Sequence, residues 1–169
     1  MRARAWLVHD DQMSDRWIVR DSITHAATKL EHAHHALGRM CASRTVEELA
    51  AAARELLVAT RGVSTLMTEV WVEQSTGANR TRSEREFSAW FVELIAPVSR
   101  HPLESETTGP PLGAPLRVAR GSSPPPFRPD DFYFDGIDGQ PALALCAEYL
   151  ASVGEVLDRA KQELRRRGL

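Results

Sequence analysis

Apolar residues recur at alternating steps of three and four in several long segments of the chain, which is the period of an amphipathic helix. The first segment runs from about Ser14 to Met40. It carries the apolar positions Val19, Ile23, Ala26, Leu30, Ala33, Leu37 and Met40. A second continues the rhythm from residue 45 to residue 70, opened by Thr45 and Glu48 as a capping box. Only residues 41–44 separate the two, so we expect an antiparallel helical hairpin.

Two further helices are predicted nearer the C-terminus. The third begins at Ser83, with Glu86 as its capping partner, and carries an aromatic stripe that runs on to Val98; Pro97 and Pro102 mark its end. The fourth begins near Pro141, because proline is favoured in the first turn of a helix. Its apolar positions return to a seven-residue rhythm as far as residue 164.

Four apolar stripes of comparable length bury one another most simply as an up-and-down four-helix bundle. We therefore predict an all-α fold, one domain over residues 1–169, with an irregular insert at 99–140. All ten prolines lie between residues 97 and 141, which sets the limits of this insert. Within it, residues 116–120 and 131–134 are candidates for a small β-hairpin.

The insert carries the aromatic triplet Phe132-Tyr133-Phe134. Because successive residues of a strand face opposite sides, at least one ring should fix the insert to the bundle. Tyr133, the central ring, is a candidate binding residue.

Composition bounds the class of protein. The chain has 169 residues, 43% hydrophobic and 26% charged, and its net charge of −2 argues against tight, sequence-blind binding to nucleic acid. Both cysteines, Cys41 and Cys146, fall on or beside predicted core stripes, which indicates free thiols. Neither a signal-peptide core nor a membrane span is recognisable, so we expect a cytoplasmic protein.

Four of the six histidines fall within eleven residues of the first helix. With about 100° per residue and Leu30 at zero, three of them lie opposite the apolar stripe: His25, His32 and His35. His34 lies about 40° from Leu30 and is the histidine expected to be buried. The outward imidazoles face water, a second chain or a ligand, and His32 and His35 are candidate binding residues.

A metal-dependent helical-bundle enzyme is one alternative. Asp21, His25, His32 and His35 are spaced by four, seven and three residues and make a weak candidate metal site on one helix face. Such sites draw ligands from several helices, typically through a second Glu-x-x-His, and Glu31-x-x-His34 has no later counterpart. Glycine-rich phosphate loops and Gly-x-Ser-x-Gly are also absent from the sequence, so no cofactor is predicted.

Arg20 and His25, with four residues between them, form a second candidate site. Metal-independent cleavage of RNA needs a histidine to move the proton of the 2′-hydroxyl and an arginine to neutralise the phosphate. The segment Arg20-Asp21-Ser22-Ile23-Thr24-His25 resembles the arginine–polar–x–histidine signature of HEPN domains, and the helix layout is similar to theirs over about residues 15–165. That family comprises small all-α bundles that often dimerise, and many members are ribonuclease toxins or defence nucleases.

The family's motif usually follows the aromatic helix, and residues 99–105 of this chain do not have its spacing. The resemblance therefore implies a HEPN-like binding protein, homodimeric, with RNA or a protein as partner and without robust catalysis. A ribonuclease of toxin or defence type that uses Arg20 and His25 remains the enzymatic alternative.

Overall fold

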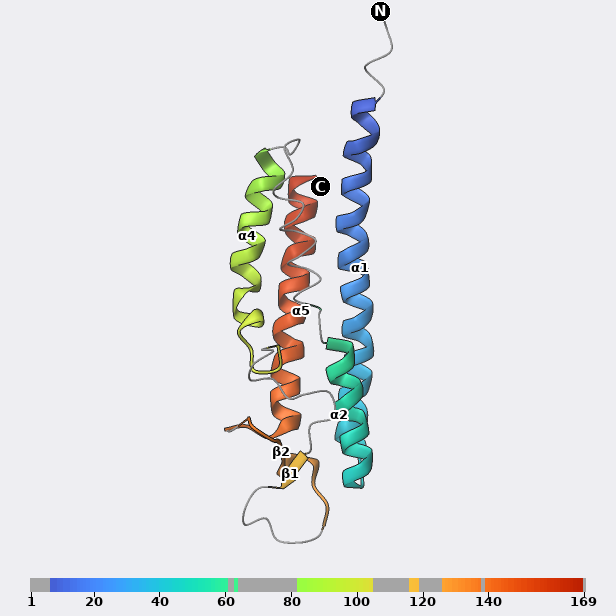
Figure 1. Cartoon of the computed structure of the whole chain (residues 1–169), viewed down its shortest axis with the longest axis vertical. Coiled ribbons are helices and arrows are strands. Elements are labelled where there is room, and N and C mark those ends of the chain that lie inside the picture. The colour runs from blue at the N-terminus through green and yellow to red at the C-terminus, as the bar shows by residue number, and fades with distance from the viewer. Residues whose placement is uncertain are drawn as a thin grey trace, which may run out of the picture.

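The computed structural model describes residues 7–60, 63, 82–104, 116–118, 126–137 and 139–168, and the backbone alone for residues 7–22, 83, 84 and 118. Within these residues it contains four long helices, α1 (Leu7–Ala42), α2 (Val46–Thr60), α4 (Arg82–Ser99) and α5 (Ala142–Arg167). Figure 1 shows α5 between α1 and α4, with each neighbour running antiparallel to it. The predicted all-α bundle with an insert is confirmed.

The first helix is longer than its apolar stripe predicts. It begins at Leu7, seven residues before the expected start at Ser14. Residues 7–13 contain neither proline nor glycine, so the helix continues where the apolar period no longer marks it. At 36 residues α1 is about 54 Å long, and its N-terminal end extends beyond the C-terminal end of α5 (Figure 1).

The predicted hairpin of α1 and α2 is present, and α2 begins with the expected cap. The backbone N–H of Glu48 donates to Oγ1 of Thr45 at 3.2 Å, and Oε2 of Glu48 accepts from the backbone N–H of Arg44 at 2.7 Å. The reciprocal bond thus comes from the residue before the cap. The predicted extension of this helix to residue 70 falls largely outside the described residues.

The start of α4 differs slightly from the prediction, and its end falls between the two prolines expected to mark it. The helix begins at Arg82, one residue before Ser83, and Glu86 accepts a 2.8 Å hydrogen bond from Nε of Arg82. The side chain of Ser83 lies outside the described residues, so the predicted capping box with Glu86 stays a prediction. Pro97 lies inside the helix, which ends at Ser99. A proline in the last turn leaves only one carbonyl of the preceding turn without its donor, so the helix tolerates it.

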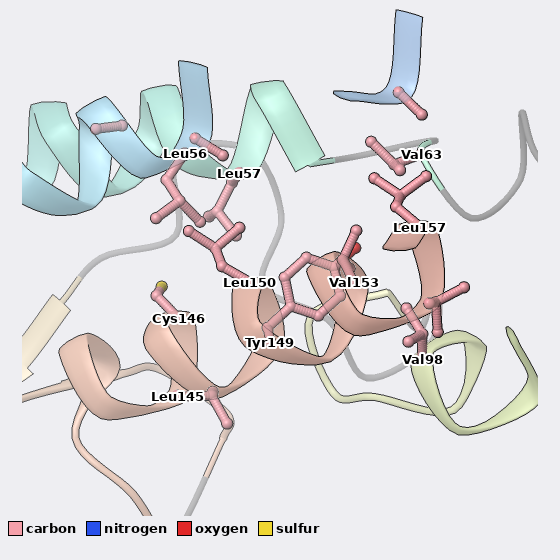
Figure 2. Packing of buried hydrophobic residues seen from close by; sticks show 14 of the residues in the cluster. Leu56, Leu57, Val63, Val98, Leu145, Cys146, Tyr149, Leu150, Val153 and Leu157 are labelled. Atoms are coloured by element: carbon pink, nitrogen blue, oxygen red, sulfur yellow. The ribbon is translucent and has the colours of Figure 1, made fainter. Parts of the chain in front are cut away.

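The last helix is the centre of the bundle. Its N-cap is Pro141, and it ends at Gly168, which adopts the left-handed conformation with φ 69° and donates its backbone N–H to the carbonyl of Arg165. Buried residues, several of them in adjacent pairs, recur once per turn along α5: Ala142, Leu145, Cys146, Tyr149, Leu150, Val153, Val156, Leu157, Ala160 and Leu164. Figure 2 shows Leu56 and Leu57 of α2 directed toward Leu150.

The two cysteines have different environments. Cys146 is fully buried in the core of α5, as predicted, and burial raises the pKa of its thiol to about 12. Cys41 is exposed in the last turn of α1, so the expectation that it belongs to the core is wrong. In that turn Met40, fully buried, occupies the position that faces the core, and the chain then leaves the helix.

The predicted hairpin of the insert is confirmed. Strands β1 (Leu116–Val118) and β2 (Phe132–Phe134) pair antiparallel, with Arg117 opposite Tyr133, and the 3₁₀ turn η1 (Pro129–Asp131) precedes β2. Phe132 and Phe134 are buried and β2 lies against α5, so two rings of the triplet fix the insert to the bundle. None of the described helices is long and apolar enough to cross a membrane.

Candidate functional site

The predicted outward face of α1 is present. His25, His32 and His35 are all exposed, whereas Ile23, Ala26, Ala33 and Met40 of the same helix are buried. These imidazoles therefore contribute nothing to the core, and their orientation agrees with the prediction. We call the exposed residues His25, Thr28, His32 and His35 the histidine face.

His34 is also exposed, so the prediction that it is the buried histidine is wrong. The buried arc of α1 is not centred on Leu30, which is itself only partly buried, but about 60° further round, near Ala33. This shift follows because α1 packs against α2 as well as α5. His34 then lies about 100° from the centre of the buried arc.

The weak metal candidates are brought together only in part. His25, His32 and His35 share the outward face, but the side chains of Arg20 and Asp21 lie outside the described residues. Among the residues whose side chains are described, no group of three or more histidine, cysteine, aspartate or glutamate side chains is placed to hold a metal ion. A closed metal centre is therefore not formed in that part of the chain.

A shallow hollow of about 420 Å³ lies at the turn between α1 and α2 and is lined by none of the residues of the histidine face. Arg39 crosses it to form an ion pair with Glu55 of α2, and Glu48 lines it as well. Oγ of the buried Ser43 donates a 2.8 Å hydrogen bond to the carbonyl of Arg39. The charged groups of the hollow thus serve mainly to hold the hairpin together.

Tyr133, the candidate binding residue of the insert, is partly buried in β2. The guanidinium of Arg117 lies over its ring, 5.5 Å from the centroid, in a cation–π contact across the hairpin. One face of the ring is therefore already occupied. This arrangement favours a structural role for Tyr133 within the hairpin.

A polar cluster that sequence reasoning missed joins the turn after α4 to the first third of α5. The hydroxyl of Tyr149 donates a hydrogen bond to Oε1 of Glu104, and the ring of His101 packs against Tyr149 with the centroids 5.0 Å apart. Tyr149 is 1% exposed. A tyrosine in an apolar helix stripe needs a hydrogen-bond partner for its hydroxyl. The position of Tyr149 in the apolar stripe could therefore have indicated this cluster from the sequence.

Burial is the main cause of both pKa shifts in this cluster. Burial, with the adjacent Glu104 carboxylate, raises the pKa of Tyr149 far above its usual range, so the hydroxyl remains protonated. Burial lowers the pKa of His101 against the opposing effect of Glu148 and Glu104, and its Nδ1 accepts a 3.2 Å bond from the backbone N–H of Leu103. The cluster is thus an internally satisfied connection between helices.

Taken together, the described residues offer an exposed, chemically varied helix face and a buried polar connection, but no nucleophile held beside a base. Such an arrangement can bind a ligand at the surface. Comparison of the chain with protein-family models, with curated proteins and with solved structures gives no match.

Proposed function

We propose that this chain is a HEPN-like helical-bundle binding protein that binds single-stranded RNA through the histidine face of α1. The observation that supports this proposal is the exposure of His25, His32 and His35 along one side of α1, outside the arc of the helix that is buried. The ion pairs among the described side chains all use arginines, so no described carboxylate forms an ion pair with these imidazoles.

The chemistry of the face suits RNA. Imidazoles donate hydrogen bonds to phosphate oxygens and stack on unpaired bases, and a threonine hydroxyl such as that of Thr28 can bond to phosphate or to a 2′-hydroxyl. The net charge of −2 provides no general attraction for a polyanion. We therefore expect weak, salt-dependent binding, with a Kd on the order of 10⁻⁶–10⁻⁴ M.

A titration of labelled RNA tests the proposal. A fluorescent single-stranded 20-mer of mixed sequence is titrated with the protein in EDTA, and anisotropy is recorded at several salt concentrations. The triple variant His25→Ala/His32→Ala/His35→Ala should bind about tenfold or more weakly, because each lost stacking contact costs about 1–3 kcal/mol. His34→Ala is the matched control, since it removes an exposed imidazole outside the histidine face.

Two results would overturn the proposal. The first is wild-type protein that leaves the anisotropy of the RNA unchanged. The second is a triple variant that binds as tightly as His34→Ala.

The ribonuclease alternative concerns the same helix. His25 is exposed five residues after Arg20 on α1, within reach of an external RNA strand. Incubating the labelled RNA with the protein in EDTA separates the two functions, because binding alone leaves the strand intact. Cleavage that is lost in His25→Ala would favour the nuclease, and intact RNA with wild-type protein would remove it.

The HEPN resemblance further implies a homodimer, which we include in the proposal. Mass measurement in solution at several protein concentrations tests it. A mass of one chain, near 18.8 kDa, at the highest concentration would remove the dimer without affecting the RNA titration.

A further inference from the structure

His32 and His35 lie one turn apart on the exposed side of α1. Two residues three positions apart in a helix are separated by about 4.5 Å along its axis, and their side chains leave it in directions about 60° apart. Side chains at this spacing are neighbours, with β-carbons about 5–6 Å apart. Both imidazoles are exposed, so rotation about their side-chain bonds can bring one ring nitrogen of each to the same point in solvent.

The other nearby histidines do not share this geometry. His25 precedes His32 by seven residues, which is about 10.5 Å along the axis and too far for a common ion. His34 points about 100° away from His35 around the helix. Arg39, one turn after His35, is held in an ion pair with Glu55, which directs its charge toward α2.

We propose that His32 and His35 form an open, two-ligand site for a divalent transition-metal ion of the borderline class, such as Zn²⁺, Ni²⁺ or Cu²⁺. Imidazole nitrogen is a preferred ligand of these ions, with metal–nitrogen distances of about 2.0–2.1 Å for zinc. Each histidine binds as the neutral imidazole, and water completes the coordination sphere. The site shares His32 and His35 with the proposed RNA-binding face, and the RNA titration is run in chelator, so that metal binding and RNA binding are measured separately.

The openness of the site follows from its surroundings. Among the residues with described side chains, no histidine, cysteine or carboxylate is placed to act as a third ligand beside His32 and His35. Structural zinc sites use four protein ligands, so two imidazoles should bind more weakly and exchange the ion readily. The ion would connect successive turns of α1 at a place where the helix is exposed.

Isothermal titration of tag-free, EDTA-treated full-length protein with ZnCl₂ tests the site. The wild type should bind one Zn²⁺ per chain. His32→Ala and His35→Ala should each weaken binding by at least about tenfold, the lower end of the loss seen even for residues that only support metal ligands. His34→Ala should bind as the wild type does, and Cys41→Ser should too, which excludes the exposed thiol as the ligand.

Circular dichroism of each variant shows that it folds, since the substituted side chains are exposed. Electron paramagnetic resonance of the Cu²⁺-loaded protein provides a second measurement, in which nitrogen hyperfine splitting should be present in the wild type and lost in the double variant His32→Ala/His35→Ala. Zinc binding retained by the double variant would overturn the proposal. Equal weakening by His34→Ala, or loss of binding in Cys41→Ser, would also overturn it.

Discussion

The hydroxyl of Tyr149, in the first third of α5, donates a hydrogen bond to the carboxylate of Glu104, 45 residues earlier and just beyond the end of α4. The tyrosine is buried and the glutamate is partly buried, so the bond lies at the edge of the core. It joins the start of the insert to the central helix. The insert is thereby held both by this bond and by the rings of β2.

We expect Tyr149→Phe to lower the free energy of unfolding by about 1–3 kcal/mol, because it removes a buried donor from a charged acceptor while leaving the ring in place. Urea denaturation measures the change. The matched control is Tyr133→Phe, which removes a hydroxyl from the partly buried tyrosine of β2 and should change stability by less than about 0.5 kcal/mol. Equal effects of the two variants would contradict this account of the Tyr149–Glu104 bond.

His101 should make stability depend on pH below neutrality. Burial lowers its pKa in the folded protein, although Glu148 and Glu104 oppose the shift. As the pH falls from about 7.5 to 5.5, the unfolded chain, with a histidine pKa near 6.5, takes up the proton first, and the free energy of unfolding decreases. In His101→Gln this part of the decrease should be lost, as measured by urea denaturation at several pH values. Parallel curves for wild type and variant would contradict it.

Glu163 should contribute stability that is lost in acid. Hydrogen bonds from Arg166 and Arg167, at 2.8 and 2.7 Å, lower its pKa from 4.5 to about 2. A carboxylate with a depressed folded-state pKa stabilises the fold above the unfolded value and loses that effect as the pH falls toward the folded value. The difference in thermal midpoint between wild type and Glu163→Gln should therefore be constant above pH 5 and shrink toward pH 2.

The control for this experiment is Glu155→Gln, which affects an exposed carboxylate 3.9 Å from Arg159. Its difference from wild type should be small at every pH, because exposed ion pairs contribute little. A Glu163→Gln difference that persists unchanged to pH 2 would contradict the predicted protonation.

Gly154 in α5 faces Leu30 of α1, and the structure leaves room for a larger residue there. A β-carbon at this glycine would lie 3.7 Å from Cδ2 of Leu30, an ordinary van der Waals contact. Gly154→Ala should therefore raise the free energy of unfolding by about 0.5–1 kcal/mol, the usual gain for alanine inside a helix. Gly38→Ala in α1, with no neighbour within 4 Å, should give the same gain. Destabilisation by Gly154→Ala alone would show a tighter α1–α5 contact.

The insert should detach from α5 when the buried ring of Phe134 is removed. Phe134 is 1% exposed. Phe134→Ala should lower the free energy of unfolding of the β-hairpin by about 3–5 kcal/mol, because it leaves a cavity where the ring was. Limited proteolysis should then cleave the insert faster than the helices. Tyr133→Ala, in the same strand, removes the cation–π contact with Arg117 and should cost about 0.5–1 kcal/mol. Equal protease sensitivity of the two variants would contradict the anchoring role of Phe134.

The helical period alone was enough to predict the bundle, the hairpin of α1 and α2, and the outward direction of His25, His32 and His35. The period marks only residues that are buried, so it missed the polar first turns of α1 from Leu7. The period also locates the centre of a buried arc only roughly. The arc was centred on Leu30, whereas the fully buried residues Ala26, Ala33 and Met40 place its centre further round, so the exposure of His34 was not foreseen.

The Tyr149–Glu104–His101 cluster illustrates a different limit. Its members come from the core stripe of α5 and from the turn after α4, and no spacing in the sequence relates them. The need of the Tyr149 hydroxyl for a hydrogen-bond acceptor could have been predicted from the sequence. The identity of that acceptor, Glu104, depends on how the end of α4 approaches α5, which is a property of the assembled bundle.

The central position of the last helix has a consequence for synthesis. Translation produces α1, α2 and α4 well before α5, yet it is α5 that packs against both α1 and α4. Until the C-terminal residues leave the ribosome, apolar side chains such as Leu56 and Leu57 are not yet covered by α5. A pause in elongation between residues 100 and 140 would therefore lengthen the period in which the unfinished protein is open to aggregation and chaperone binding.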